Sequence, residues 1–431
     1  MRKNLRLTEI QLLIVPAMLP VIGMLMVILV PRQQVNWDAK DLWMTFVFFG
    51  LLIAAHLTLT FTLPRSDQML LPLVSGLTAF GLIMSQRLET VRTGNIASRQ
   101  VIWIGLSYLV FIGVVIGLRN VMRLKRYKYT FLVIGLALTG GAAVAGTEVN
   151  GARLWFNLGF FSFQPGELLK VCLVIFLAGY LDDKRDLLQA PFKIFGIPFP
   201  PLPYLLPMVA MWAISMGLLF FQKDLGPAQL FFGVFLIMLY VASGRAWYVL
   251  AGITAFGLAS FLAYQEFNHV QTRIIAWTNP WPEGQDRAYQ IVQALFGFAQ
   301  GGVFGKGLGY GAPNSIPEVH TDYVFAAIGE EMGLAGTLGI IALYVLLIYR
   351  CFHIALQARN GFYQFLSIGL ASLLGLQTFI IIGGVTKLIP LTGMTLPFIS
   401  YGGSSLLVNF AIAGILIRIS AESNPAGGDR S

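Results

Sequence analysis

Two long apolar runs and the polar segment between them decide the fold: WYVLAGITAFGLASFLAYQ at residues 247–265, VFAAIGEEMGLAGTLGIIALYVLLIY at residues 324–349, and a break from Glu266 to Tyr323. Each run is long enough to cross the roughly 30 Å of hydrocarbon in a bilayer as a helix. The break is longer than most other connections in the chain, and it gathers carboxylates, histidines, a lysine and arginines. Long connections often carry binding and catalytic residues, so we expect a functional site in this break.

The composition extends this interpretation to the whole chain. Of 431 residues, 56% are hydrophobic and 11% are charged, which is too little charge to cover a water-soluble protein. A segment in lipid must satisfy its backbone polar groups internally, so the apolar runs are predicted to be helices. We predict an all-α polytopic membrane protein with about twelve transmembrane helices and a large extracytoplasmic loop. The predicted spans lie near residues 8–30, 42–63, 69–86, 100–118, 129–146, 165–182, 203–221, 227–243, 247–265, 324–349, 363–384 and 403–420.

The basic residues predict which way the spans run. Short loops next to spans set orientation, and the loop from Arg119 to Lys128 carries five basic residues. Placing this loop inside also places both termini and 17 of the 29 Lys and Arg residues inside, and it puts the 266–323 break outside. The net charge of +9 is therefore attributed to basic cytoplasmic loops, and nucleic acid is not an expected partner.

Charged residues beside the spans are candidate site residues. Glu167 and Lys170 lie three residues apart on one helical face at the start of a span, where unpaired charge is costly, so an ion pair or a substrate contact is expected. Arg153 lies beside a tryptophan, and an interfacial anchor explains it as well as a substrate contact does. Asp224 lies in a short turn, where a plain charged turn and a functional role are about equally supported.

The break itself offers the residue types that group transfer at a membrane surface needs. Solvated loop charges are the favoured interpretation for most of the carboxylates Glu283, Asp286, Glu318 and Asp322. The alternative is a base for an incoming hydroxyl, with Lys306 as a cation for a phosphate leaving group. The run Gly305–Gly311 is not a nucleotide-binding loop, because glycine follows Lys306 and no strand can precede it; a turn that needs glycine explains it better.

Two further segments lie at membrane depth. Glu330 and its neighbour Glu331 point to different helix faces, so a structural partner inside the bundle is as well supported as a catalytic role. The stretch from Lys387 to Ser405 is broken by proline and glycine, and irregular backbone at this depth is tolerated only inside protein or along a cavity. We expect that stretch to line a site. The two cysteines, Cys172 and Cys351, show no disulfide or metal-ligand spacing.

Six motifs in order along the chain carry a resemblance to a known family. They are Gly-Ala-Arg-x-Trp at 151–155, Phe-Gln-Pro-x-Glu-x-x-Lys at 163–170, Gln-x-Asp-Leu-Gly at 222–226, Asn-Pro-Trp at 279–281 with Tyr-Gln at 289–290, His-Thr-Asp-Tyr-x-Phe-Ala at 320–326 with Gly-Glu-Glu at 329–331, and Pro-Phe-Ile-Ser-Tyr-Gly-Gly-Ser-Ser at 397–405. Together they resemble the shape, elongation, division and sporulation (SEDS) family of bacteria, the RodA, FtsW and SpoVE proteins.

The resemblance implies an activity, a location and partners. It implies a peptidoglycan glycosyltransferase that polymerises lipid II, an undecaprenyl-linked substrate, on the outer face of the bacterial cytoplasmic membrane. It also implies a class B penicillin-binding protein as the partner that crosslinks the strands, with membrane lipids around the spans. A divalent cation, Mg²⁺ or Mn²⁺, is the one candidate cofactor, and the sequence shows no ligand set for it.

The resemblance also implies roles for individual residues. The family's essential loop aspartate follows Asn-Pro-Trp-x, and an ungapped match places Glu283 there, while Asp286 is the only nearby aspartate. Either could be the general base, and the register favours Glu283. The implied substrate contacts are Arg153, Glu167, Lys170, Asp224, Lys306, His320, Asp322, Glu330, Ser400 and Ser404.

The chain also departs from the family pattern. The family usually has ten spans, so residues 1–68 are interpreted as an extra N-terminal helix pair, residues 69–421 as the membrane core with its loop at about 266–323, and residues 422–431 as a disordered cytoplasmic tail. In the turn at 222–227, Lys223 replaces a proline and Pro227 replaces a threonine. A lipid II flippase and an inactive scaffold for the penicillin-binding protein stay open as alternatives, and the sequence does not separate elongation from division or sporulation.

Overall fold

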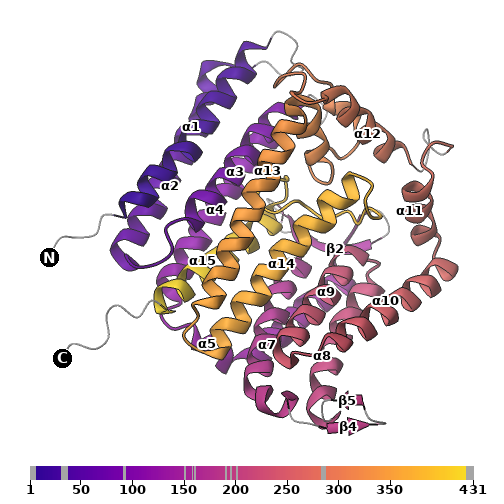
Figure 1. Ribbon diagram of the computed structural model, residues 1–431. Coiled ribbons are helices and arrows are strands. Elements are labelled where there is room, and N and C mark those ends of the chain that lie inside the picture. Colours follow the sequence, from indigo (N-terminus) through magenta and orange to yellow (C-terminus); the bar gives the residue numbers. More distant parts are fainter. Residues whose placement is uncertain are drawn as a thin grey trace. The chain divides into compact units, whose positions relative to one another are not determined.

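The computed structural model describes residues 6–30, 37–90, 94–149, 152–157, 159, 162–189, 192–194, 197–199, 202–282 and 288–423 (Figure 1). Its helices in the first half of the chain are α1 (Leu7–Leu29), α2 (Trp43–Thr62), α3 (Leu70–Arg87), α4 (Ile96–Gly117), α5 (Met122–Arg126), α6 (Lys128–Ala145), α7 (Pro165–Gln189) and α8 (Leu202–Phe221). Those in the second half are α9 (Leu225–Ser243), α10 (Ala246–Glu266), α11 (Asn268–Thr278), α12 (Tyr289–Gly301), α13 (Val324–Leu356), α14 (Gly361–Val385) and α15 (Gly403–Ser423).

The helices confirm the predicted fold class. Each of the twelve predicted spans coincides with a helix of the structure. In the described part of the chain, nine helices are long and apolar enough to cross a membrane, and the Leu205–Phe221 part of α8 is apolar but shorter. The chain is therefore an all-α polytopic integral membrane protein, and the number of twelve crossings stays a prediction. The predicted tail begins inside α15, which ends at Ser423, and its residues 424–431 lie outside the described part.

The chain divides into two compact units. The first is formed by Met1–Gly117, Tyr264–Arg350 and Gln377–Ile417, and the second by Leu118–Ala263, Cys351–Leu376 and Arg418–Ser431.

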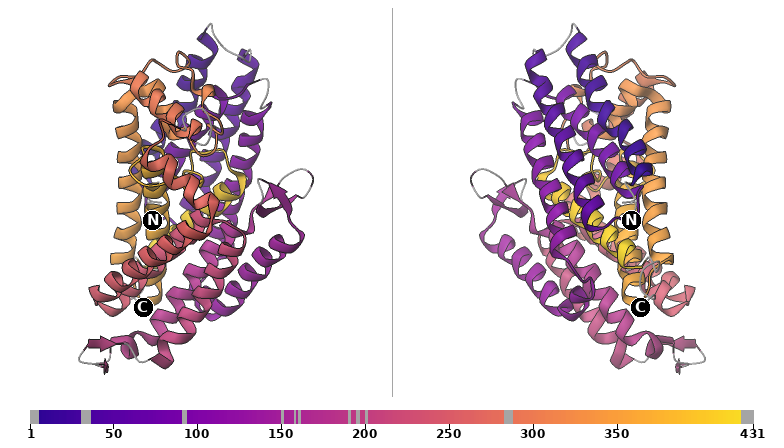
Figure 2. Two further views of the ribbon diagram at one scale, coloured as in Figure 1. Left: turned by 90° about the vertical axis from the view of Figure 1, so that its right-hand side faces the viewer. Right: turned by 90° about the vertical axis from the view of Figure 1, so that its left-hand side faces the viewer.

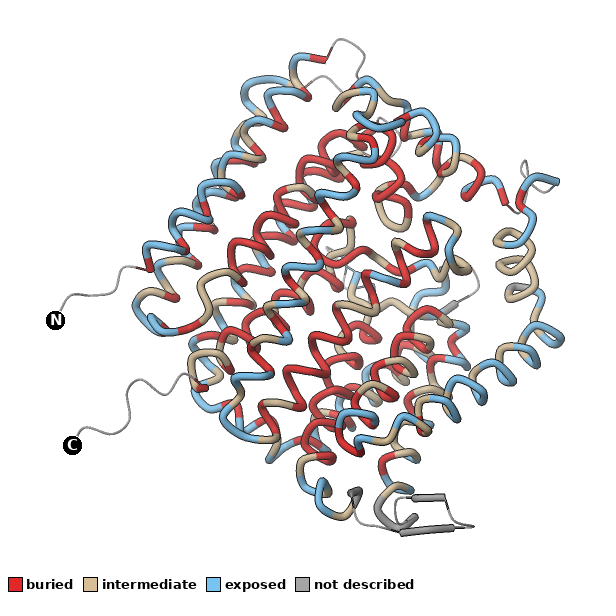
Figure 3. Tube along the Cα trace, viewed as in Figure 1, coloured by how far each residue is buried: buried red, intermediate tan, exposed pale blue. Residues whose placement is uncertain are grey.

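In the first unit, α1 and α2 run side by side, and α1 packs on α3 (Figures 1 and 2). Burial on α1 follows one stripe with helical spacing, at Glu9, Leu13, Pro16, Pro20, Gly23 and Val27. The exposed face of α1 is also apolar, whereas α3 is buried almost throughout (Figure 3). A helix with apolar residues on all sides suits protein on one face and lipid on the other.

In the second unit, α7 packs against α6 and α9, and a charged cluster fixes its far end. Lys125 Nζ lies 2.6 Å from Asp182 Oδ2 and 2.8 Å from Asp183 Oδ1, and Lys128 also contacts Asp183. Because both lysines belong to the basic loop that sets the predicted orientation, part of that charge is balanced by the carboxylates of α7.

The second unit also contains short strands that the sequence did not predict. β1 (Thr147–Val149), β2 (Ala152–Asn157) and β3 (Ser162–Phe163) form an antiparallel sheet in the order β1-β2-β3, with Glu148 opposite Arg153. β4 (Phe192–Ile194) and β5 (Ile197–Phe199) form a hairpin between α7 and α8 (Figure 1). Strands of two to six residues leave too little sequence for an alternating pattern to show.

The predicted loop at 266–323 is not a plain loop. It contains α11 and α12 and a single 3₁₀ turn at Pro313–Ser315. α12 buries Ile291, Val292, Ala294 and Gly297 on one face. These helices are shorter than a span and amphipathic. Their polar residues therefore make the segment look like a loop between two apolar runs.

Candidate functional site

A cavity of about 180 Å³ opens in the first unit where the predicted site segments meet. We call it the polar cavity. Its walls come from α11, the start of α12, the residues just before α13, the end of α14 and the irregular stretch after it. The lining residues are Thr272, Arg273, Ala276, Trp277, Gln290, Ile291, Asp322, Tyr323, Gly384, Ile389, Leu391 and Gly393. The broken stretch after α14 does line a cavity, as expected from its proline and glycine content.

Two side chains of α11 hold that wall together. Arg273 Nη1 donates a hydrogen bond to the carbonyl oxygen of Thr392 over 3.2 Å, and Trp277 Nε1 donates one to the carbonyl oxygen of Lys387 over 3.2 Å. Neither side chain carries a prediction from the sequence. The sequence pattern that could have indicated them is Arg273 four residues before Trp277, with Arg273 ten residues before Glu283.

Asp322 and Arg273 flank the backbone of Gly393 in this cavity. A Cβ atom at Gly393 would lie 3.5 Å from Asp322 Oδ2 and 3.9 Å from Arg273 Nη2. Burial raises the pKa of Asp322 to about 6, and the charge of Glu318 acts in the same direction, while a hydrogen bond from Thr321 and the charge of Arg273 act against it. An acid with this pKa exchanges protons close to neutral pH. Of the predicted contacts, Asp322 is the one that faces the polar cavity.

His320 and Ser400 join two segments of the site. The backbone N–H of Tyr401 donates to the carbonyl oxygen of His320 over 2.9 Å, and Ser400 Oγ donates to the carbonyl oxygen of Thr321 over 2.5 Å. Burial lowers the pKa of His320. Ser404 is buried near the start of α15. None of these three predicted contacts is among the described residues that line the polar cavity.

Lys306 and Glu330 fasten the glycine-rich run Gly305–Gly311 to α13. Lys306 Nζ lies 3.5 Å from Glu330 Oε1 and also contacts the side chain of Gln300. The same carboxylate oxygen accepts a hydrogen bond of 2.8 Å from the backbone N–H of Ala312. Glu330 is buried, so these contacts satisfy a charge that would otherwise be costly there. These contacts give Glu330 structural partners, and its role as a substrate contact stays a prediction.

The predicted ion pair at the start of α7 forms in the second unit. Lys170 Nζ lies 2.6 Å from Glu167 Oε2, and both residues are buried. A buried pair of this kind has a net charge close to zero. Removal of one partner leaves the other as an unpaired buried charge, which is costly.

Three motifs of the resemblance meet elsewhere in the second unit. Gln222 Nε2 donates to the carbonyl oxygen of Arg153 over 3.2 Å, and Gln164 Nε2 lies 3.5 Å from Asp224 Oδ2. The Arg153 side chain is half exposed and lies 3.4 Å from Glu148 Oε2. The turn at 222–224 is therefore more than a plain charged turn, because it ties β2 to the residues before α7.

Glu283 and Asp286, the two candidate bases, lie outside the described residues. For a divalent cation, the described part of the chain assembles no group of three His, Cys, Asp or Glu side chains that could hold a metal ion. A Mg²⁺ or Mn²⁺ ion stays a prediction, and no step of the proposed reaction depends on one.

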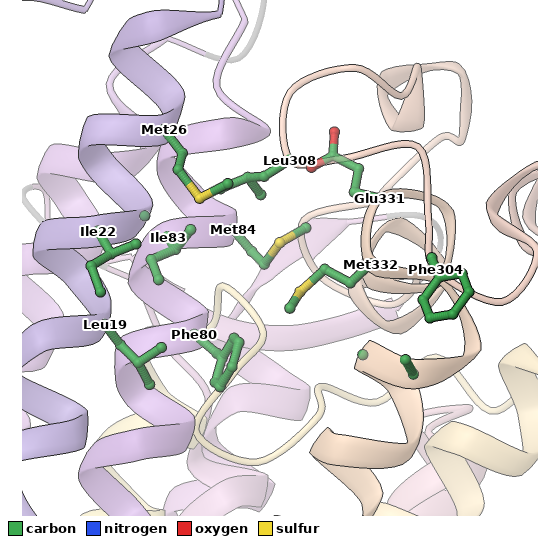
Figure 4. Close-up of a pocket in the computed structure, with 13 residues that line it drawn as sticks. Leu19, Ile22, Met26, Phe80, Ile83, Met84, Phe304, Leu308, Glu331 and Met332 are labelled. Carbon is green, nitrogen blue, oxygen red and sulfur yellow. The ribbon is translucent and has the colours of Figure 1, made fainter.

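A second cavity in the first unit is apolar and has a volume of about 370 Å³ (Figure 4). We call it the apolar cavity. It is lined by Leu19, Ile22, Gly23 and Met26 of α1, Phe80, Ile83 and Met84 of α3, Phe304 and Leu308, and Glu331, Met332, Ala335 and Gly336 of α13. Glu331 is the single charged residue among them, and its Oε1 accepts a hydrogen bond of 2.7 Å from Arg87 Nε. A cavity with such walls suits a hydrocarbon chain.

Comparison with known sequences agrees with the motif pattern. The chain is 39% identical over 426 residues to peptidoglycan glycosyltransferase RodA of Mycobacterium tuberculosis strain H37Rv, covering 96% of this chain and 90% of that protein. It is 40% identical over 381 residues to peptidoglycan glycosyltransferase RodA of Mycobacterium leprae, covering 87% of this chain and 82% of that protein.

Solved structures and a family model give the same result. The fold resembles the rod shape determining protein RodA of Thermus thermophilus, with a TM-score of 0.61 and 27% identity over 83% of this chain and 98% of that one. It also resembles a chain of a peptidoglycan synthase complex that coordinates polymerization and crosslinking, with a TM-score of 0.69 and 28% identity over 84% of this chain and 99% of that one. Residues 67–425 match the model of the cell cycle protein family that includes FtsW, RodA and SpoVE. The chain therefore belongs to the FtsW/RodA/SpoVE family, as its six motifs predict.

Proposed function

We propose that this chain is a peptidoglycan glycosyltransferase that polymerises lipid II into glycan strands on the outer face of the cytoplasmic membrane, releasing undecaprenyl pyrophosphate. The observation that carries the proposal is 39% identity over 96% of the chain to a RodA protein named as a peptidoglycan glycosyltransferase. The polar cavity adds an acid near neutral pKa and an arginine beside the segment where the family resemblance puts the base.

The reaction needs a base for an acceptor hydroxyl. In the proposed mechanism, Glu283 or Asp286 takes the proton from the 4-hydroxyl of the acceptor GlcNAc, and that oxygen attacks the anomeric carbon of the donor MurNAc. The bond from that carbon to the pyrophosphate breaks. Trp277 and Gln290, which lie on either side of this segment in the sequence, both line the polar cavity, which supports delivery of the carboxylate there.

The leaving pyrophosphate needs cations. Arg153, Lys170 and Lys306 are the residues expected to offset its charge. Lys170 and Lys306 each contact a carboxylate, of Glu167 and Glu330. The pyrophosphate would have to compete with those carboxylates for the lysine ammonium groups. The ion pairs hold the lysines in place, but they also offset part of the positive charge.

The hydrocarbon tail of the substrate needs an apolar surface. The apolar cavity between α1, α3 and α13 offers one, with three methionines whose flexible side chains adapt to varied shapes. We propose it as a place for part of a lipid chain.

The proposed partners and location follow from the same similarity. We propose that the chain lies in the bacterial cytoplasmic membrane with both termini cytoplasmic, an orientation supported by the five basic residues of the loop from Arg119 to Lys128. A class B penicillin-binding protein is proposed as the partner that crosslinks the strands, supported by similarity to a chain of a synthase complex that couples polymerization with crosslinking.

The experiment that tests this function uses the purified chain with its penicillin-binding partner and lipid II. A glycosyltransferase yields glycan polymer and undecaprenyl pyrophosphate. A flippase, the alternative class, moves labelled lipid II across a vesicle membrane without forming polymer, and an inactive scaffold binds the partner and does neither. Absence of polymer with a folded, partner-bound chain would overturn the proposal.

A further inference from the structure

α11 presents two donors on one face. Arg273 and Trp277 are four residues apart, one helical turn, so their side chains project from the same side of α11. Both end on backbone carbonyls of one segment: Arg273 Nη1 on Thr392 and Trp277 Nε1 on Lys387, each over 3.2 Å. We call this pair of bonds the α11 clamp.

The segment that receives the clamp has unusual backbone. It lacks regular secondary structure between α14 and α15, so its carbonyl groups depend on partners outside a helix or sheet ladder, as when Gln377 Nε2 donates to the carbonyl oxygen of Thr395 over 2.8 Å. Lys387 has φ of +63°, a left-handed value that is uncommon for a side chain other than glycine, and Gly393 has φ of +72°. Strained backbone of this kind persists only where surrounding contacts determine it, and clusters at functional sites.

The clamp is part of the polar cavity wall. Arg273 and Trp277 line the cavity together with Asp322 and Gly393. α11 ends at Thr278, five residues before Glu283 in the sequence, so the clamp also fixes the position of the helix that precedes the candidate bases. A displacement of α11 would therefore change the wall of the polar cavity.

We propose that Arg273 and Trp277 are positioning residues of the glycosyl transfer, which dock α11 on the carbonyls of Thr392 and Lys387 and so set the geometry of the polar cavity. The inference rests on the proposed function for its kinetic consequence. A misplacement of about an ångström in a reacting group can slow a positioned reaction by ~10²-fold, so loss of one clamp bond affects turnover more than substrate binding.

The sharpest variants are Trp277→Phe and Arg273→Gln. The first keeps an aromatic ring and removes the indole N–H together with part of the indole ring, and the second keeps an N–H donor and removes the charge. Trp277→Phe is expected to lower kcat for lipid II polymerisation by roughly 3- to 10-fold, with KM changed less than about twofold, because one net hydrogen bond is worth about a tenfold ratio at most. Arg273→Gln is expected to lower kcat less than Arg273→Ala, since glutamine retains a donor for Thr392.

A second readout does not depend on activity. Amide hydrogen exchange of residues 388–393 should be faster in Trp277→Phe and Arg273→Ala than in the wild-type protein, at unchanged global stability. The matched control is Trp43→Phe, which removes the indole N–H from a half-exposed tryptophan of α2. Unchanged exchange in the clamp variants, or a loss confined to KM, would overturn the inference. If the wild-type protein makes no polymer, the proposed function fails, and the exchange measurement still decides whether the clamp exists.

Discussion

Asp322 is the residue whose protonation the structure ties most clearly to the site. Burial raises its pKa from 3.8 to about 6. The folded state therefore holds the proton to higher pH than the unfolded chain does. The stability that Asp322 contributes is fully present below the ordinary pKa and is lost as pH rises through about 6.

Asp322→Asn removes this titration while keeping the size of the side chain. We expect the apparent Tm of the variant, relative to wild type, to rise as pH increases from 5 to 7, because only the wild type loses stability over that interval. Thermal unfolding in detergent at one scan rate measures the difference. A Tm difference that is constant with pH contradicts the prediction.

Glu318→Gln supplies the control for that experiment. The charge of Glu318 raises the pKa of Asp322, so its removal should move the midpoint of the pH dependence to a lower value. Glu318 itself is exposed, so its own loss should leave the Tm at pH 5 nearly unchanged.

At the scale of elements, the glycine-rich run depends on a close approach to α13 that only glycine permits. The N–H groups of Lys306 and Gly307 donate to the carbonyl oxygens of Glu330 and Glu331 over 3.0 and 2.9 Å. A Cβ atom at Gly305 would lie 2.1 Å from the carbonyl oxygen of Glu331, and its φ is +80°. The sequence predicted a turn needing glycine here, and the positive φ values confirm it.

Gly305→Ala is expected to displace the run and lower the apparent Tm by several degrees. The matched variant is Gly302→Ala, because Gly302 also has positive φ, of +52°, but an added Cβ meets nothing within 4 Å. Gly302→Ala should therefore show the backbone cost alone, ~1–3 kcal/mol. Equal Tm values for the two variants would show that the close packing against α13 contributes nothing.

The long elements were predictable and the short ones were not. An apolar run such as residues 324–349 predicts a helix, because a helix satisfies the backbone polar groups of a single segment in lipid. α11 and β2 are specified by contacts to distant segments: Trp277 to Lys387, and Arg153 to Gln222. Local periodicity does not contain such partners, so the residue types of the site could be predicted but not the clamp that Arg273 and Trp277 form.

At the scale of the whole molecule, a buried network joins the N-terminal helix pair to the rest of the first unit. Arg6 is 1% exposed, pairs with Glu9, and donates to the carbonyl oxygens of Leu63 and Asp67 over 2.9 and 2.8 Å. Asp67 in turn accepts hydrogen bonds from the first N–H groups of α3 and pairs with Arg350 of α13. The family match begins at residue 67, which is one member of this network.

Arg6→Ala is expected to destabilise the chain by ~1–3 kcal/mol, because the buried Glu9 carboxylate loses its guanidinium partner and keeps the contact of 2.6 Å with His56 Nδ1. The expected result is a lower apparent Tm together with faster amide exchange in α1 and α2. Arg99→Ala, at an exposed arginine of α4, is the control and should leave both unchanged. An Arg6→Ala protein as stable as wild type would contradict this account of the helix pair.

The membrane class and the span positions could be inferred from composition and apolar runs, because lipid requires every span to be apolar and long enough to cross it. Ion pairs across the chain could not, as Arg87 and Glu331 show: they are 244 residues apart, and no local pattern links them. Local patterns also do not show which side chain faces the substrate. The motifs therefore identify the family, but they do not decide whether Glu283 or Asp286 is the base.

The most direct test of the central claim is the initial rate of lipid II polymerisation by the purified chain with its penicillin-binding partner, compared for wild type, Glu283→Ala, Asp286→Ala and the double variant. Loss of a general base costs ~10²–10⁴-fold. We predict that one single variant shows most of this loss and that the double variant loses at least 10²-fold, with Tm and partner binding unchanged. A double variant that polymerises lipid II at the wild-type rate would contradict the assignment of the base to this segment.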